Sequence, residues 1–397
     1  MMRLAERMMR MAGSPTMKVT AAVDRLRRSG VEVIDFGAGE PDFDTPEPIK
    51  AAAHQALRAG FTRYTPVGGA IELRQAIAAR YEADYGIDLG DAEVMATAGG
   101  KQALYNAALA LFGPGDEVIV HAPAWPSIPE QVRLAEATPV LVPGDPSDGF
   151  AIRASALLER ITPRTRGIVI NSPCNPTGAL IAEAELAAVA DEAARRGIWI
   201  VLDLCYEKLI YDAVAHNLPR VLADRCRDRM ALCGSASKAY AMTGWRCGWL
   251  LGPAPLIAAC SAIQSHATSN VSSITQQAVI AALTGPQDAV TRMLAEYRVR
   301  RDSLHDWLAA EPRLRCRRPA GAFYMFVDVR GVLAGLGLTT SAELADALLE
   351  RARVAVTPGE AFEAPGFIRL SYATSMTVLR EGSARLLEFV ASGVPAA

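Results

Sequence analysis

The sequence predicts an α/β protein: a large domain, whose mostly parallel sheet lies between helices, and a smaller α+β domain. The 397 residues exceed what one hydrophobic core usually holds. Short apolar runs without polar alternation indicate strands covered on both faces, and the helical patterns between them favour parallel pairing. We expect an N-terminal segment, 1–45, that packs with the small domain, a large domain over 46–287 and the small domain over 288–397.

The elements follow from these runs in chain order. The predicted strands of the large domain are Glu93–Thr97, Glu117–His121, Gly167–Asn171, Ile198–Asp203, Met230–Gly234 and Cys247–Leu251. The predicted helices between them are Lys101–Phe112 and Ala182–Arg196. The C-terminal region is expected to hold the helices Ala289–Ala310, Ser341–Arg351 and Thr377–Ser392 and the strands Gly321–Val329 and Phe367–Ser371. The arginines of 1–17 fit a transit peptide, but Glu6 and the lack of an apolar stretch favour a starting helix of a cytosolic protein.

Composition argues against several classes of function. The 41 Lys and Arg nearly cancel the 43 Asp and Glu, so no basic excess is left for a nucleic acid, although a local pocket for a phosphate or carboxylate remains open. Seven cysteines without a C-x-x-C pair, and five histidines without a metal-type spacing, predict no disulfide framework, no metal site and a reducing cytoplasm. The charge-free stretch Cys247–Gln287 is too polar for a membrane span and favours a buried helix and a subunit contact.

The most informative stretch is Gly234-Ser235-Ala236-Ser237-Lys238, which follows an apolar strand and precedes Arg246. Ser235 and Arg246 can bond phosphate oxygens, the arginine through two parallel N–H groups. Lys238 is then free to act as a nucleophile, because desolvation and nearby positive charge favour the uncharged amine. The alternative is a Ser/Lys turn at the surface.

Two further strands end in polar residues. Asp203 and Tyr206 follow a buried strand, where a carboxylate is well placed for a ligand. Beneath a pyridinium ring, Asp203 would keep the ring nitrogen protonated and make the ring an electron sink, while Tyr206 would reach the ring oxygen. Asn175, in the rigid loop 171–178, could donate to the same oxygen. The alternatives are a helix N-cap aspartate with a packed tyrosine, and a plain turn.

Gly99 and Gly100 precede a helix, whose free N–H groups and dipole form a cup for an anion. The sequence around them is not a Walker loop, and Gly37-Ala38-Gly39-Glu40-Pro41-Asp42 does not complete G-x-G-x-x-G, which argues against a dinucleotide site. A dinucleotide-binding fold therefore loses its best support.

Trp125 and Arg369 complete the set of candidates. Trp125 opens a loop at a strand end and suits stacking on a heteroaromatic ring, although a core tryptophan is the alternative. Arg369 is a charge within an apolar strand, so it needs an anion, either a structural carboxylate or that of a substrate. Together these residues supply a lysine, a phosphate cup, partners for a ring and a carboxylate clamp.

In their order along the chain these residues resemble the class I/II aminotransferases of the fold-type I pyridoxal-phosphate superfamily, in particular the bacterial aspartate and aspartate/prephenate aminotransferases. The resemblance covers nearly the whole chain. It is carried by Gly39-Glu40-Pro41-Asp42-Phe43-Asp44-Thr45-Pro46, Tyr64-Thr65-Pro66, Gly99-Gly100-Lys101-Gln102-Ala103-Leu104, Asn171 to Gly178, Ser237-Lys238 with Gly244-Trp245-Arg246, and Arg369-Leu370-Ser371-Tyr372-Ala373-Thr374.

The resemblance implies a seven-stranded sheet, pyridoxal 5'-phosphate as cofactor and a homodimer with shared active sites. It implies that Lys238 forms the Schiff base, Asp203 pairs with the ring nitrogen and Tyr206 contacts the ring oxygen. The other implied residues are Trp125 and Asn175 at the ring, then Gly99, Gly100, Lys101, Ser235, Arg246 and Tyr64 of the partner subunit at the phosphate, and Gly39, Trp125, Asn175, Lys101 and Arg369 at the substrate.

Two positions depart from the family pattern. Leu204 follows the ring aspartate where the family often has glutamate, and Ala124 precedes Trp125 where the family often has an aromatic residue. Both departures leave the mechanism intact and bear on the choice of substrate. Ala124 in particular is expected to enlarge the pocket.

We therefore expect transamination, in which Lys238 moves a proton from the substrate α-carbon to the cofactor. Lys101 stands at the first turn of a helix, where a cation is disfavoured, so we expect it to bind the distal carboxylate of aspartate, glutamate or 2-oxoglutarate. Aromatic substrates or prephenate are the alternative, as is a C–S lyase or decarboxylase on the same site. A pyridoxal-phosphate-binding regulator lacks room for a DNA-binding domain before Gly39, and a dehydrogenase lacks its glycine fingerprint.

Overall fold

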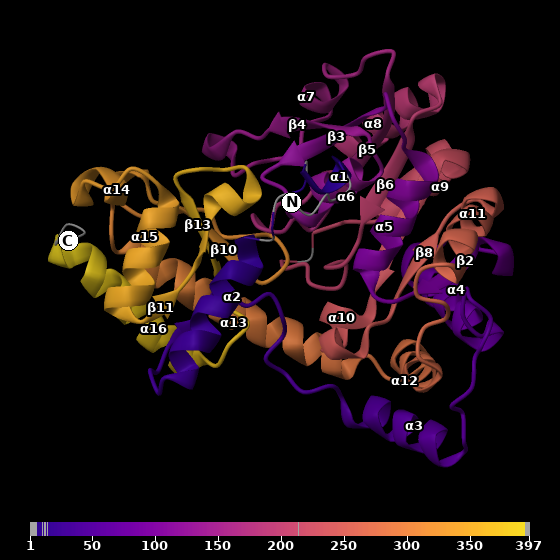
Figure 1. The fold of residues 1–397 in the computed structure, drawn as a ribbon, viewed down its shortest axis with the longest axis horizontal. Helices are drawn as coiled ribbons and strands as arrows, with labels where there is room; N and C mark the ends of the chain where they lie inside the picture. The colour runs from indigo at the N-terminus through magenta and orange to yellow at the C-terminus, as the bar shows by residue number, and fades with distance from the viewer. Residues whose placement is uncertain (1–5, 10, 12, 14, 213, 394–397) are drawn as a thin grey trace.

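The computed structural model describes residues 6–9, 11, 13, 15–212 and 214–393. It shows a large region built on one wide sheet and a smaller region in which the C-terminal part of the chain packs with the helix α2 (Pro15–Arg28) (Figure 1). Helix α13 (Asp288–Ala309) joins the two, because Val290 packs into the core of the large region and Leu304 into the core of the smaller one.

The large sheet has seven strands in the order β2-β8-β7-β6-β5-β3-β4. Strands β3 to β7 run parallel, whereas β8 is antiparallel to both of its neighbours. The predicted seven-stranded, mostly parallel sheet is confirmed. The strands are β2 (Val94–Thr97), β3 (Glu117–Ala122), β4 (Thr138–Pro143), β5 (Thr165–Asn171), β6 (Trp199–Asp203), β7 (Met230–Ser235) and β8 (Gly248–Leu251).

Strand β4 is absent from the strands predicted from the sequence. It forms the edge of the sheet, and most of its side chains are partly or fully exposed. An edge strand buries little of its surface, so it lacks the continuous apolar run that marks the central strands.

Helices cover both faces of this sheet, which explains why the central strands read as unbroken apolar runs. Ile168 and Ile170 of β5 pack into one core cluster, whereas Val169 between them packs into the cluster on the opposite face. The helices of the first face are α4 (Ile71–Tyr85), α8 (Glu183–Arg196), α9 (Leu218–Cys226) and α12 (Ser273–Thr284). Those of the second face are α5 (Gly100–Leu111), α6 (Ser127–Leu134) and α11 (Ala254–Ser265).

The smaller region holds a four-stranded antiparallel sheet in the order β12-β13-β10-β9. In addition, β1 (Ile34–Asp35) of the N-terminal segment pairs with β11 (Val354–Ala355). The predicted strand Gly321–Val329 is shorter than expected, since only its second half pairs with β13. The elements are β9 (Arg315–Cys316), β10 (Tyr324–Asp328), α14 (Arg330–Leu336), α15 (Ser341–Ala347), a π-helical turn (Leu348–Ala352), β12 (Thr357–Pro358), β13 (Phe367–Ser371) and α16 (Met376–Ser392).

The helix expected over 1–17 lies partly outside the described residues, within which α1 (Glu6–Met9) and the start of α2 are helical. Of the helices that the structure describes, no single one is long and apolar enough to cross a membrane. One bent pair of helices, Arg330–Leu336 with Ser341–Ala352, reaches the length and apolar composition of a membrane span, but by these two criteria alone. Across the described residues no three His, Cys, Asp or Glu side chains gather as metal ligands would.

The carboxyl ends of the central strands place polar side chains side by side. Asn171, Asp203 and Ser235 are the last residues of β5, β6 and β7, and Asn171 pairs in register with Asp203. Because parallel strands end at one edge of a sheet, the chain sets three polar groups along that edge, where a ligand can reach them.

Candidate active site

A cavity of about 490 Å³ lies at this edge of the sheet and reaches the smaller region. Apart from Gly99 and Tyr64, every candidate residue from the sequence lines it. These lining residues are Gly39, Gly100, Lys101, Trp125, Asn175, Asp203, Tyr206, Ser235, Lys238, Arg246 and Arg369.

Lys238 projects into the cavity from the short helix α10 (Ala236–Ala239), which the Ser235 hydroxyl caps by accepting the Ser237 N–H at 3.1 Å. Its Nζ donates to the carbonyl oxygen of Gly39 at 2.5 Å. Burial lowers the pKa of the Lys238 ammonium, although the nearby Cys205 and Glu40 oppose that effect. A lowered pKa increases the fraction of uncharged amine, the form that attacks a carbonyl.

Asp203 is 4% exposed, and within the described residues its carboxylate accepts one hydrogen bond, from the N–H of Cys205 at 3.0 Å. Burial raises the pKa of Asp203 to about 6. A buried carboxylate with so few partners can bind a cationic group in the cavity. This environment suits a protonated ring nitrogen.

Tyr206 lies in the same wall and is buried. Its hydroxyl is 2.7 Å from that of Tyr324 of β10, so the large and smaller regions meet at this wall of the cavity. Burial raises the pKa of Tyr206 well above its usual value, which keeps the phenol protonated and able to donate.

Gly100 and Arg246 form one side of the cavity, at the N-terminus of α5, and Gly99 packs against Arg246. Gly99 has a φ of 86°, and a Cβ on it would lie 2.5 Å from the Arg246 guanidinium, while a Cβ on Gly248 would lie 2.4 Å from the N–H nitrogen of Gly100. Arg246 donates to the carbonyl oxygens of Thr243 and Ala98 and forms no ion pair with a described residue. Free N–H groups at a helix start and an arginine without a carboxylate are the donors that a phosphate needs.

Arg369 lies in the central strand β13 and is 2% exposed. Its guanidinium donates to Asn175 Oδ1 at 2.9 Å and to the Gly37 carbonyl at 2.8 Å, and it stacks over the Tyr324 ring at 4.2 Å. Among the described residues it has no acidic partner, and its Nε is buried without a hydrogen bond. A buried cation without an anion points to a carboxylate ligand.

Lys101 and Trp125 close the cavity on a third side, with the Lys101 ammonium 5.0 Å from the Trp125 ring centroid. Burial and the charge of Arg246 lower the pKa of Lys101, and no carboxylate of a described residue pairs with it. Lys101 is thus, like Arg246 and Arg369, a cation that faces this cavity without an acidic partner among the described residues.

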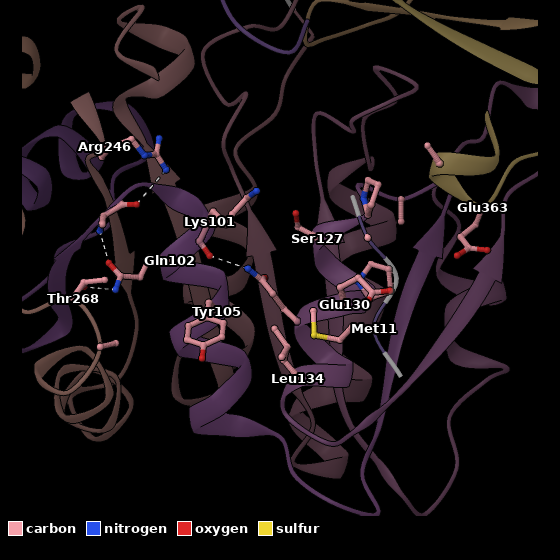
Figure 2. A pocket seen from close by; sticks show the side chains of 18 of the residues that line it. Met11, Lys101, Gln102, Tyr105, Ser127, Glu130, Leu134, Arg246, Thr268 and Glu363 are labelled. Carbon is pink, nitrogen blue, oxygen red and sulfur yellow. Dashed lines mark hydrogen bonds between the residues drawn. The ribbon is translucent and has the colours of Figure 1, made fainter. Parts of the chain in front are cut away.

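A second cavity, of about 620 Å³, opens between α5 and α6 and shares Lys101 and Arg246 with the first (Figure 2). Tyr105 of α5 and Leu134 of α6 are among the residues that line it. Ala124, expected to enlarge the substrate pocket, lines this second cavity and is absent from the lining of the first. The expectation that Ala124 enlarges the substrate pocket stays a prediction, and the space that Ala124 borders is this second cavity.

Two further candidates lie outside the first cavity. Gly99 lies behind Arg246, so it shapes the cup without lining it. Tyr64 is 91% exposed and does not reach the cavity of its own chain. Such an exposed aromatic side chain is available to another molecule.

Sequence reasoning missed several residues of the site. Tyr324 lines the cavity beneath Arg369 and bonds Tyr206, and Cys205 lines it beside Asp203. Thr243 donates to Glu40 at 2.9 Å, which links the N-terminal segment to the loop that carries Arg246. Tyr324 could have been found as a polar tip within an apolar strand, as Arg369 was, whereas nothing in the sequence pairs Thr243 with Glu40.

Comparison with known proteins agrees with this geometry. The family model for aminotransferase class I and II matches residues 31–386. The chain is 41% identical to an aspartate aminotransferase of Geobacillus stearothermophilus, over 98% of this chain and 99% of that protein. It is 43% identical to an aspartate/prephenate aminotransferase of Cereibacter sphaeroides, over 98% of both.

Solved structures give the same result. The aspartate aminotransferase of Rhizobium meliloti superposes with a TM-score of 0.92 at 40% identity, over 97% of this chain and 98% of that one. The structure of the Thermus thermophilus aspartate aminotransferase with maleate also superposes with a TM-score of 0.92. Its sequence is 40% identical, and the match covers 98% of this chain and 100% of that one. The chain therefore belongs to the class I and II aminotransferase family and is a pyridoxal-phosphate-dependent aminotransferase.

Proposed function

We propose that this aminotransferase moves the amino group between an acidic L-amino acid, aspartate or glutamate, and the oxo acids 2-oxoglutarate and oxaloacetate. The observation that carries the proposal is that Arg369 and Lys101, two cations without acidic partners among the described residues, line the cavity in addition to Arg246 at its phosphate end. Two such cations suit a substrate with two carboxylates. Relatives at about 40% identity are named aspartate aminotransferases, which supports the same substrate class.

When bound, pyridoxal phosphate supplies an aldehyde that condenses with the amino group and a ring that withdraws electrons from the α-carbon. Around it, we propose that Lys238 Nζ takes the proton from the substrate α-carbon and delivers it to C4′ of the cofactor. Asp203 holds the ring nitrogen in its protonated form. Tyr206 and Asn175 donate to the ring oxygen, and Trp125 stacks on the ring.

The remaining roles concern binding. The phosphate is held by Gly100, Lys101, Ser235 and Arg246, which line one end of the cavity, and Gly99 shapes that end by its close approach to Arg246. Arg369 and Asn175 grip the α-carboxylate, with the Gly39 backbone beside it. Lys101 is placed between the two ends, so it can reach the distal carboxylate of the substrate.

We further propose a cytoplasmic homodimer in which Tyr64 of one subunit reaches the phosphate of the other. The exposure of Tyr64 supports this, as does the charge-free segment near Thr268, which lines the second cavity beside Lys101. The free state of all seven cysteines fits a reducing compartment. Sedimentation is the test of assembly: a fully active monomer at working concentration would contradict the dimer.

The division into an N-terminal segment (1–45), a large domain (46–287) and a small domain (288–397) also stays a proposal. Separate core clusters in the large and smaller regions support it, as does the pairing of β1 with β11. Limited proteolysis that cuts first within 280–290 would support the second boundary, whereas a first cut inside either core would contradict it.

A bulkier substrate is the second candidate. The 620 Å³ cavity beyond Lys101 is largely apolar and is bounded by the small side chain of Ala124. One relative is named an aspartate/prephenate aminotransferase. An oxo acid with a ring between its two carboxylates could extend from Arg369 past Lys101 into this space.

A panel of amino donors tests the function directly. With an amino donor alone, a transaminase converts its cofactor stoichiometrically to the aminated form, which is followed by absorbance. We expect aspartate and glutamate to react faster than alanine or phenylalanine. Faster reaction with the neutral donors would contradict the acidic specificity, and release of a decarboxylated or sulfur-free product without conversion of the cofactor would contradict transamination.

A further inference from the structure

The ends of β3 and β5 are joined by a side chain where the strand ladder stops. The two strands pair up to Val120 and Val169, and both then continue for two residues, to Ala122 and Asn171, without pairing with each other. The N–H of Asn171 therefore has no strand carbonyl to bond on that side. Instead it donates to His121 Nε2 at 3.1 Å.

This bond lies in the interior, where an unpaired N–H is costly. His121 is buried, and burial lowers its pKa to about 4. The imidazole therefore stays neutral at neutral pH, with its Nε2 lone pair available to the Asn171 N–H and its proton on Nδ1. His121 does not line the cavity, so it cannot touch the substrate or the cofactor there.

From Asn171 the hydrogen bonds continue into the site. Asn171 Oδ1 accepts the Asn175 N–H at 2.7 Å, and Asn175 Oδ1 accepts Arg369 Nη1 at 2.9 Å. A chain of three hydrogen bonds thus runs from His121 to the guanidinium that faces the cavity. A second contact joins the same two loops, since the Cys174 thiol donates to the Pro123 carbonyl at 3.6 Å.

We propose that His121 is a positioning residue for the α-carboxylate clamp. By accepting the Asn171 N–H, it fixes the start of the loop 171–178 and so the direction in which Asn175 orients Arg369. This inference rests on the proposed roles of Asn175 and Arg369. Because every amino acid carries an α-carboxylate, the effect of His121 extends to all donors alike, in contrast to that of Lys101.

Two substitutions of His121 form a matched pair. The amide oxygen of glutamine is as many bonds from the Cα as Nε2 of histidine, whereas that of asparagine matches Nδ1 and falls short of Asn171. His121→Gln can thus restore the acceptor, while His121→Asn and His121→Leu cannot. His54→Leu, at an exposed position of α3 (Glu47–Arg58), is the control for loss of a histidine.

Three measurements test the proposal on the holoenzyme and on the cofactor-free protein. For His121→Leu and His121→Asn we expect the KM for aspartate and for alanine to rise by the same factor, about tenfold, with kcat per bound cofactor nearly unchanged. We expect the Kd of maleate, an unreactive dicarboxylate, to rise in parallel. In the cofactor-free protein, amide hydrogen exchange across 171–178 should be faster in these two variants.

The His121→Gln variant and the His54→Leu control should both behave as the wild type in all three measurements. A purely structural role would instead lower Tm and the active fraction while KM and the Kd of maleate stay unchanged, and that result would overturn the proposal. So would equal behaviour of His121→Gln and His121→Asn.

Arg369→Lys separates this inference from the proposed function. If Arg369→Lys leaves KM unchanged, the proposed clamp itself is wrong. If Arg369→Lys raises KM but His121→Leu does not, the clamp stands and only the role of His121 fails.

Discussion

The two ends of the active-site cavity are built differently. The phosphate end takes Gly99, Gly100, Ser235 and Arg246 from loops of the large sheet, and it includes the N-terminus of α5. The carboxylate end takes Arg369 from the smaller region and binds it to Asn175, which lies 194 residues away along the chain. The first end needs one sheet to fold, whereas the second needs two regions and the N-terminal segment to pack together.

The arginines at the two ends also differ in how deeply they are buried. Arg246 is exposed at the rim and its donors are shared with nearby carbonyls, so water can solvate it when the cavity is empty. Arg369 is fully enclosed, with Tyr324 beneath it and the Gly37 carbonyl beside it. A buried cation of this kind binds an anion strongly but depends on every neighbour that orients it. The phosphate end should therefore tolerate change better than the carboxylate end.

The largest effect is expected at Lys238, which belongs to neither end. Lys238→Ala removes the group that moves the proton, so turnover should fall by more than about ten-thousandfold. The phosphate end should still hold the cofactor. Borohydride reduction of the wild type, followed by peptide mapping, should leave the pyridoxyl label on Lys238, and a label on Lys101 or Lys208 would overturn the assignment.

Asp203→Ala should cause the second-largest loss of turnover, because it removes the charge that holds the ring nitrogen protonated. Electrostatic contributions of this kind often exceed about 3 kcal/mol, so we expect turnover to fall by more than about a hundredfold. Cofactor affinity, measured by equilibrium dialysis, should change far less, since the phosphate end is intact. Turnover within tenfold of the wild type would refute the role.

The comparison between the two ends is tested by the pair Arg369→Lys and Arg246→Lys. Arg369→Lys keeps the charge but loses the paired hydrogen bonds, so kcat/KM should fall by about thirtyfold to a hundredfold for every donor. Arg246→Lys should chiefly raise the Kd of the cofactor. If the two variants had the same profile, the two ends would not be independent.

Lys101→Ala tests whether Lys101 binds the distal carboxylate of the substrate. The contact of an ammonium with a carboxylate in a closed site is worth about 1.5–3 kcal/mol, which predicts a loss of about tenfold to a hundredfold with acidic substrates. Neutral donors should be little affected. An equal loss with all donors would leave Lys101 only its contact with the phosphate and would contradict a contact with the distal carboxylate.

The smallest effect concerns pH and the protein without its cofactor. Folded Asp203 keeps its proton up to a pH of about 6, because burial raises its pKa, whereas the unfolded chain releases it near the ordinary value of 3.8. The folded state therefore binds more protons between these values, and it loses stability as the pH rises through them. We expect a loss of about 1–2 kcal/mol, since the cavity admits water beside the carboxylate. Urea unfolding of the cofactor-free protein should show this loss, and Asp203→Asn should remove it.

Much of the fold and of the site could be predicted from the sequence. Unbroken apolar runs marked the central strands because both faces of the sheet are covered, as Ile168 and Val169 show by packing on opposite faces. Polar residues directly after such runs marked the site, since the ends of parallel strands share one edge. The edge strand β4 escaped prediction because it buries too little surface to need an apolar run.

The sequence by itself determined which chemical groups the protein carries: the lysine after Ser235 and Ser237, the carboxylate at the end of β6, the glycines at the start of α5 and the charge within β13. Only the tertiary structure decided which of them meet. Tyr324 with Tyr206, Glu40 with Thr243, and His121 with Asn171 are contacts between segments far apart in the chain. A local sequence pattern reflects the environment of a residue within its own strand or helix. Contacts between distant segments depend instead on how whole elements pack against one another, and no short stretch of sequence specifies that packing.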